Sequence, residues 1–206
     1  MSRKKSMSEG YQIRDQGGPH FLTFTVTDWV DVFTRKIYKD LVIESLQFCQ
    51  DNKGLDMYAY VIMSNHIHLI IGSKLGKLSE LVRDLKSYLA KIIINKIQEG
   101  PESRSDWMLK RFEFAARSNS RNSGYQFWRY GNHPEEVFSE KFLWTKVNYI
   151  HMNPVRAGIV SKASEYLYSS ASNYVHGKGL ISFELPSNPI IDVLGKDRFN
   201  FEIDEW

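Results

Sequence analysis

Two histidines, His66 and His68, occupy alternate positions at the start of an apolar run. Side chains two residues apart on a strand leave from the same face, so these two imidazoles can converge on one ion. Two imidazoles alone are typical of transition metals, whereas magnesium prefers oxygen ligands. The pair therefore needs an oxygen ligand and a substrate phosphate to hold magnesium or manganese. So short a motif is equally compatible with ordinary hydrogen-bonded histidines on an exposed sheet face.

A second group of polar residues follows about eighty positions later, where Tyr149 and Asn153 are four residues apart and Lys146 precedes them by one turn. On a helix these three side chains are neighbours. A phenol has a pKa near ~10 and is a poor nucleophile unless its anion is stabilised, which Lys146 is placed to do in part. The alternative is a hydrogen-bonded tyrosine at the rim of the core and a helix-ending asparagine. His151 falls on another face and is predicted to be structural or close to DNA.

The elements that must position these residues follow from hydrophobic periodicity. Strand and helix alternate in the order strand, helix, strand, strand, helix, strand, which predicts an α+β fold, a ferredoxin-like sandwich with an antiparallel sheet and helices on one face. A helix starting at Ser139 is expected to end near Met152, because Pro154 disfavours helical geometry at the residue before it. The other predicted elements are strands at 22–26, 55–63, 66–71 and 125–130, and helices over 41–53 and 78–99.

Size and composition predict one domain with few special features. The chain has 206 residues, a formal charge of +3 and a single cysteine, Cys49, which excludes an internal disulfide and a cysteine-rich zinc site. No apolar run is long enough to span a membrane, and no apolar stretch follows the basic start as in a secretory signal, so a cytoplasmic protein is expected. The predicted organisation is a flexible arm over 1–19, one domain over 20–185 with an irregular insertion at 101–124, and a tail over 186–206.

Residues 102–130 combine arginines and lysines with many aromatic side chains. Cations for phosphates and aromatic rings for unpaired bases are what single-strand binding requires. Aromatic residues at such spacing are also typical of a core, with the arginines on a solvated face. We expect Phe112, Phe127 and Trp128 to be largely buried. The candidate DNA-binding residues are Arg156, Lys86, Arg117 and Arg121.

Three segments, residues 60–70, 149–160 and 166–171, together resemble the single-tyrosine HUH transposases, and in particular the REP-associated tyrosine transposases. The resemblance covers about residues 20–185. It implies a ferredoxin-like fold that cuts and rejoins single-stranded DNA beside a hairpin. By the family pattern His66, His68 and Asn153 bind Mg²⁺ or Mn²⁺, and Tyr149 is the nucleophile that becomes joined to a 5′-phosphate.

The resemblance leaves several alternatives open. Relatives include dimers that exchange the tyrosine helix, so this protein is expected to be a monomer or a homodimer. A catalytically silent single-strand-binding module is the main alternative function. A hydrolase that uses the two histidines and a metal-activated water, without Tyr149, is another.

Overall fold

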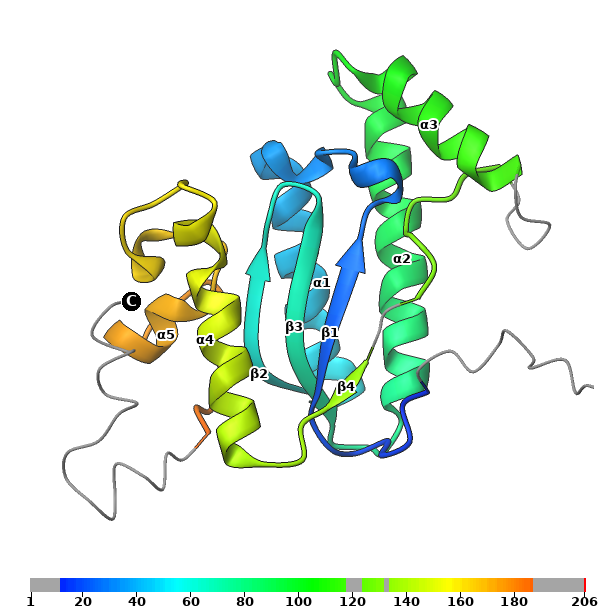
Figure 1. The fold of residues 1–206 in the computed structure, drawn as a ribbon. Helices are drawn as coiled ribbons and strands as arrows, with labels where there is room; N and C mark the ends of the chain where they lie inside the picture. Colours follow the sequence, from blue (N-terminus) through cyan, green and yellow to red (C-terminus); the bar gives the residue numbers. More distant parts are fainter. Residues whose placement is uncertain (1–11, 118–123, 132–133, 187–205) are drawn as a thin grey trace, which may run out of the picture.

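The computed structural model describes residues 12–117, 124–131, 134–186 and 206. The first five elements follow the predicted order of strand, helix, strand, strand and helix, with short 3-10 turns and one further helix in addition (Figure 1). The strands are β1 (His20–Thr25), β2 (Leu55–Ile62), β3 (His66–Ser73) and β4 (Glu135–Glu136). The α-helices are α1 (Lys36–Lys53), α2 (Leu78–Glu99), α3 (Ser105–Arg117), α4 (Glu140–Arg156) and α5 (Ala171–His176), and the 3-10 turns are η1 (Thr27–Trp29), η2 (Val32–Thr34) and η3 (Ala163–Glu165).

The four strands form one sheet in the order β2-β3-β1-β4, and each neighbouring pair is antiparallel. The hairpin between β2 and β3 turns at Ser64 and Asn65, where the Met63 N–H donates to the His66 carbonyl at 2.9 Å. In the adjacent pair, Thr23 of β1 lies opposite His68, and Thr25 lies opposite His66. The predicted α+β class and antiparallel sheet are therefore confirmed.

The fourth strand differs from the prediction. Residues 125–130 make only an isolated bridge between Trp128 and Val26, although the Arg129 N–H also donates to the Thr25 carbonyl at 2.9 Å. The strand that pairs with β1 inside the sheet is instead the short β4. The prediction of a strand at 125–130 was wrong because aromatic side chains in this segment pack into the core between α2 and α3 without extending the ladder.

The two faces of the sheet are covered differently. Alternate residues of β3, namely Ile67, Leu69 and Ile71, point into the main core against α1 and α2. The opposite face, which includes Ile70, packs against α4 in a second apolar cluster. Figure 1 shows α1 and α2 on one side of the sheet and α4 on the other. Helices thus occupy both faces, and the expectation of helices on one face holds only for α1 and α2.

Helix α4 begins where the sequence predicts and ends later. The hydroxyl of Ser139 accepts from the Phe142 N–H at 3.2 Å, which caps the first turn. The helix then continues through Pro154 to Arg156, four residues beyond the predicted end at Met152. Proline removes one backbone donor, but Pro154 is buried, and the Ala157 and Ile159 N–H groups donate to the Asn153 and Pro154 carbonyls, which closes the last turn.

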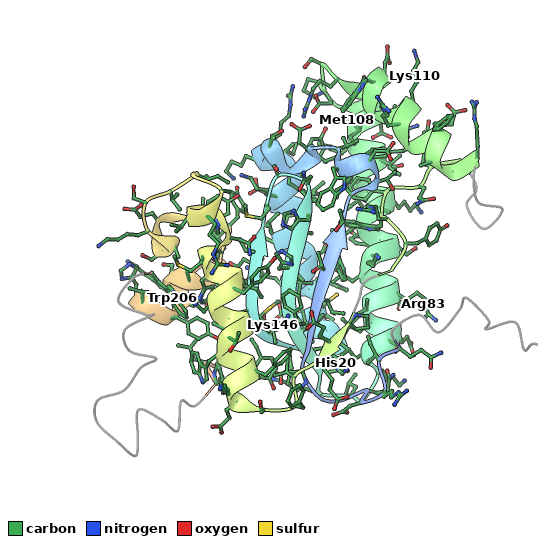
Figure 2. The ribbon with its side chains drawn as sticks, viewed as in Figure 1. His20, Arg83, Met108, Lys110, Lys146 and Trp206 are labelled. Atoms are coloured by element: carbon green, nitrogen blue, oxygen red, sulfur yellow. The ribbon has the colours of Figure 1, made fainter. Side chains whose placement is uncertain are left out.

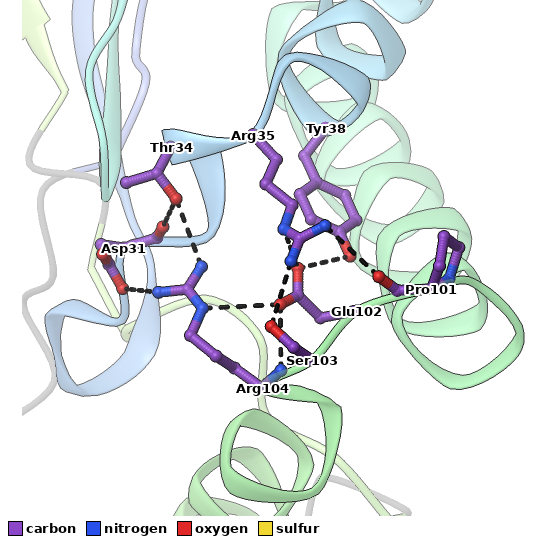
Figure 3. Close-up of polar contacts among 8 residues, drawn as sticks. All are labelled: Asp31, Thr34, Arg35, Tyr38, Pro101, Glu102, Ser103 and Arg104. Carbon is purple, nitrogen blue, oxygen red and sulfur yellow. Dashed lines mark hydrogen bonds and ion pairs between the residues drawn. The ribbon is translucent and has the colours of Figure 1, made fainter.

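Residues 101–124, predicted as an irregular insertion, contain the 13-residue helix α3. A buried carboxylate attaches its start to α1 (Figure 3). Glu102 forms ion pairs with Arg35 at 2.9 Å and Arg104 at 3.5 Å and accepts from the Tyr38 hydroxyl at 3.2 Å. Arg104 also reaches Asp31 at 2.7 Å. This network fixes α3 above the end of the sheet that carries η1.

The two predicted terminal segments are described only in part. Within the arm predicted for 1–19, Gln16 accepts from the Ser79 N–H at 2.9 Å and so caps the start of α2. Within the predicted tail, Trp206 is buried, donates its indole N–H to Asn148 at 2.8 Å, and lies beside α4 and α5 (Figure 2). Residues 1–11 and 187–205 lie outside the described residues. None of the described helices combines the length and the apolar character that crossing a bilayer requires.

Candidate active site

The two histidines of β3 lie side by side on the face of the sheet that also packs against α4. Their ring centroids are 4.7 Å apart, and the rings meet edge to face. His66 is half-buried at the end of the strand, whereas His68 is only 5% exposed. The strand alternation that buries Ile67 and Leu69 on the other face therefore places both imidazoles together, as the spacing predicts.

Each imidazole is held through its Nδ1 atom. Nδ1 of His68 lies 2.9 Å from the hydroxyl of Thr23, and Nδ1 of His66 lies 2.7 Å from the side-chain oxygen of Asn65. The Asn65 oxygen can only accept, so it favours the His66 tautomer with hydrogen on Nδ1, which leaves the Nε2 lone pair for a ligand. The Thr23 hydroxyl can accept or donate, so its contact allows the same tautomer in His68 without selecting it. Metal-binding histidines are commonly oriented by such contacts to the other ring nitrogen.

Burial keeps both imidazoles neutral. Desolvation lowers the pKa of His66, and it lowers the pKa of His68 to about 3, with smaller contributions from the charges of His66 and Lys146. A neutral imidazole is the form that binds a metal ion. The two rings can therefore supply two nitrogen ligands of a divalent-ion site.

The remaining ligands must supply oxygen. Among the described residues no group of three or more histidine, cysteine, aspartate or glutamate side chains could hold an ion. Asn153 lies on α4 one turn after Tyr149, and its side-chain N–H donates to the Tyr149 carbonyl at 2.7 Å. That contact leaves the amide oxygen of Asn153 as its possible ligand atom, but among the described residues no hydrogen bond joins Asn153 to His66 or His68.

Helix α4 places Tyr149 directly beside the histidines. The Tyr149 ring lies 5.3 Å from the His68 ring, centroid to centroid, and packs edge-on against Phe21 at 5.9 Å. Phe21 in turn stacks on His68 at 5.4 Å. Tyr149 is 40% exposed, so part of its side chain is open to solvent. Two segments separated by about eighty residues thus meet at one point on the surface.

Lys146 lies between α4 and the edge of the sheet (Figure 2). Its ammonium forms an ion pair with Glu135 of β4 at 2.8 Å and lies 4.3 Å from the centroid of the Phe21 ring. It is close enough to His68 to lower that group's pKa. The ammonium is therefore engaged by Glu135, an interaction that the sequence did not predict.

The four predicted DNA-binding residues have different surroundings. Arg156 is exposed at the end of α4, and its guanidinium lies 5.7 Å from the centroid of the Tyr149 ring. Lys86 belongs to the helix layer: its ammonium lies 5.2 Å from the Phe24 ring, and burial lowers its pKa to about 8. Arg117 is exposed on α3 and pairs with Glu113 at 2.8 Å. Arg121 lies outside the described residues.

His151 has a structural environment, one of the two roles expected for it. The ring is fully buried, and its Nε2 lies 2.8 Å from the hydroxyl of Ser170. Ser170 also accepts from the Tyr60 N–H at 2.9 Å, so it connects α4 to β2. Phe127 and Trp128 are buried, as is Phe112, in agreement with the expectation for these aromatic residues.

Sequence reasoning missed the residues that orient the site. Thr23 and Phe21 support His68, Asn65 supports His66, and Glu135 binds Lys146. Asn65 had a usable signal, because it immediately precedes His66 in the hairpin turn. The other three come from β1 and β4, and nothing in the sequence indicates which of their residues face the hairpin.

Comparisons with known proteins found a family model and a solved structure that match the chain. The family model described as "Transposase IS200 like" matches residues 20–140, which include both histidines and end at the first residue of α4. A solved structure of a REP-associated tyrosine transposase bound to a REP hairpin is similar at 18% identity, with a TM-score of 0.55, over 88% of this chain and 98% of that chain. None of the curated proteins matches the chain significantly.

The family match spans more than half of the chain, and the solved structure supports the fold independently of it. Within the matched range the paired histidines lie on the central hairpin, and Tyr149 follows that range on the helix that packs beside them. The chain belongs to the IS200-like transposase family.

Proposed function

We propose that this protein cleaves and rejoins single-stranded DNA at hairpin sites through a 5′-phosphotyrosine intermediate. The observation that carries the proposal is the position of Tyr149, whose ring lies 5.3 Å from that of His68, and the His68 ring lies 4.7 Å from that of His66. A nucleophile and a pair of neutral nitrogen ligands are thereby presented together. The hairpin bound in the related solved structure makes hairpin DNA the first substrate to test.

In the proposed reaction, the phenol of Tyr149 loses its proton and its oxygen forms a bond to phosphorus. The bond from phosphorus to the 3′ oxygen breaks, and that oxygen takes up a proton to become a free hydroxyl. The same steps in reverse rejoin the strands, because the phosphotyrosine bond retains the energy of the broken phosphodiester. Arg156, next to the Tyr149 ring, is placed to bind a neighbouring phosphate.

A divalent ion, Mg²⁺ or Mn²⁺, would be held by Nε2 of His66 and His68 and by the amide oxygen of Asn153. When bound, it supplies Lewis-acid polarisation of the scissile phosphate. Lys146 adds positive charge to the same area, and Glu135 keeps its ammonium against the Phe21 ring. We propose that this charge also helps to stabilise the anion of Tyr149, since Lys146 precedes Tyr149 by about one turn of α4.

The proposed site is assembled within one chain. Tyr149 and His68 are in contact without a second copy of the protein, and the second apolar cluster holds α4 against β2 and β3 of the same chain. We therefore propose that the tyrosine acts in cis. Mixing a Tyr149→Phe protein with a His68→Ala protein tests this, because activity in the mixture requires exchange of α4 between two copies.

The central experiment is capture of the covalent intermediate. The protein is incubated with Mn²⁺ and a library of single-stranded oligonucleotides that carry hairpins with single-stranded flanks, and adducts that survive denaturation are collected. A label at the 3′ end should remain with the protein, and a label at the 5′ end should leave on a fragment with a 3′-hydroxyl. Tyr149→Phe should abolish the adduct and retain DNA binding, and removal of the ion with a chelator should also abolish it.

Tyr88→Phe is the matched control, because Tyr88 is also exposed but lies on α2, in the helix layer on the opposite face of the sheet. This variant should form the adduct as the unmodified protein does. Cleavage that survives Tyr149→Phe would favour hydrolysis by a metal-activated water instead. Binding of hairpins without cleavage of any library member would favour a catalytically silent binding module.

A further inference from the structure

An open groove beside the histidine pair is not used by the proposed reaction. It has a volume of about 660 Å³ and lies where η1, α3 and the segment at 124–131 come together. Three large aromatic side chains line it, one from each of these elements: Trp29 is 54% exposed, Phe114 67% and Tyr130 55%. Large apolar rings are seldom gathered on a surface in this way unless they contact a partner.

The backbone that presents Trp29 is strained. Asp28 and Trp29 have φ values of 53° and 56°, in the left-handed region that residues with side chains rarely adopt. Hydrogen bonds hold the turn in place: the Thr27 N–H donates to the Phe127 carbonyl at 2.8 Å, and the Trp29 carbonyl accepts from Asn65 at 3.3 Å. Backbone strain of this kind is concentrated at functional sites, where the surrounding structure enforces it.

The groove borders the histidine pair through Trp29, which belongs to its lining and packs against His66. The Trp29 ring lies edge-on to His66, with centroids 6.2 Å apart. Asn65 contacts both residues, since its amide N–H donates to the Trp29 carbonyl and its oxygen lies 2.7 Å from Nδ1 of His66. A strand that passes the histidines in this direction would therefore enter the groove directly.

The charges of the groove suit a nucleic acid strand with unpaired bases. The guanidinium of Arg129 lies 5.3 Å from the centroid of the Trp29 ring, where it can contact a backbone phosphate. The carboxylate of Asp28, also in the lining, disfavours a phosphate at its own position and can accept from the amino group of a base. Exposed rings beside a cation are the usual means of binding single strands by stacking.

We infer that this groove binds unpaired bases of the single-stranded DNA flank next to the hairpin, by stacking on Trp29, Phe114 and Tyr130. The inference rests on the proposed function only in placing cleavage next to His66. Stacking accepts any base, so the groove would hold the flank in register while sequence is recognised elsewhere. The inference also explains why α3 is attached to α1 through the ion pairs of Glu102. This attachment holds Phe114 of α3 in the same groove as Trp29.

The test compares two oligonucleotides that differ only in their bases. Both carry the same hairpin and the same flank, but in one the flank nucleotides are abasic, so the phosphates are unchanged. The unmodified protein should bind the flank with bases roughly tenfold more tightly than the abasic flank, the effect expected for a base stacked on an aromatic ring. In Phe114→Ala, and separately in Trp29→Ala, this ratio should fall towards one while affinity for the abasic oligonucleotide is unchanged.

Phe48→Ala is the matched control, because Phe48 is also exposed, at 55%, but lies on α1 in a different groove. It should keep the tenfold ratio. A ratio of one in the unmodified protein, or a ratio unaffected by both groove variants, would overturn the inference. So would groove variants that weaken both oligonucleotides equally, or that change only self-association, which would indicate a protein partner.

The same samples keep this inference separate from the proposed function. Base-dependent binding that requires Phe114, in a protein that forms no covalent adduct, would support the groove and contradict the phosphotyrosine reaction. The opposite result is an adduct that depends on Tyr149 and forms equally well with either flank, in a protein that binds the two oligonucleotides equally. That result would support the reaction and contradict base binding in the groove.

Discussion

The two faces of the sheet are built from the same strands and serve different purposes. Toward α1 and α2, β3 presents Ile67, Leu69 and Ile71 to a continuous apolar core. Toward α4, it presents His66 and His68, and only Ile70 joins the smaller apolar cluster. Because alternate side chains of a strand point to opposite faces, one sequence can specify a core and a reactive site at once. The comparison implies that substitutions on one face should affect stability and those on the other activity.

The largest expected contrast is between neighbours on β3. Leu69→Ala should lower the free energy of unfolding by about 2–5 kcal/mol, because it removes a fully buried side chain and leaves a cavity. His66→Ala, at a half-buried position, should cost about 1 kcal/mol or less and should abolish metal-dependent adduct formation. Urea denaturation measures the first effect and the adduct assay the second. Equal losses of stability would show that the two faces are not separable in this way.

A second prediction concerns a buried phenol in the helix layer, away from the histidine face. Tyr38, in the helix layer, is buried beside Glu102, and desolvation together with that carboxylate raises its pKa to about 12. Above pH 10 the unfolded chain loses this proton while the folded protein retains it, so folding stability falls with rising pH. The slope attributable to Tyr38 should reach about 1.4 kcal/mol per pH unit between pH ~10 and ~12.

Denaturant midpoints between pH 9 and 12 measure this dependence. Tyr38→Phe should give a shallower decline than the unmodified protein. An identical slope in Tyr38→Phe would mean that this phenol does not titrate differently in the folded and unfolded states.

A third prediction concerns the start of α4. Ser139→Ala removes the acceptor for the Phe142 N–H and should destabilise the protein by about 1 kcal/mol. Adduct formation should persist, because the apolar cluster that includes Leu143, Val147 and Ile150 still anchors the helix to the sheet. Ser139→Asp, which restores a capping side chain, should recover the lost stability. Loss of the adduct in Ser139→Ala would show that Tyr149 depends on the cap for its position.

The smallest effect is expected on the exposed side of α3. Arg117→Ala breaks an exposed pair with Glu113 and should change the free energy of unfolding by no more than about 0.5 kcal/mol. If Arg117 binds a DNA phosphate, as the sequence predicts, the slope of log affinity against log salt should fall by roughly one. Glu113→Ala is the control, since it breaks the same pair and leaves the arginine. An unchanged salt slope in Arg117→Ala would exclude a role on DNA.

The sequence by itself determined the elements with strong local patterns. Periodicity located the β2–β3 hairpin, α1 and α2, and the spacing of His66 and His68 placed both on one face. The start of α4 followed from Ser139, and the adjacency of Tyr149 and Asn153 from helical geometry. These features depend on backbone geometry over a few residues, which residue order fixes directly.

Only the tertiary structure decided what these elements meet. Three contacts of the site join segments that are far apart in the chain. Tyr149 packs against His68, Lys146 forms an ion pair with Glu135, and Thr23 forms a hydrogen bond with His68. Hydrophobic periodicity likewise did not predict that β1 pairs with the short β4 rather than with a strand at 125–130. Such contacts depend on which apolar faces pack together, and this packing depends on all the elements of the core and not on any one segment.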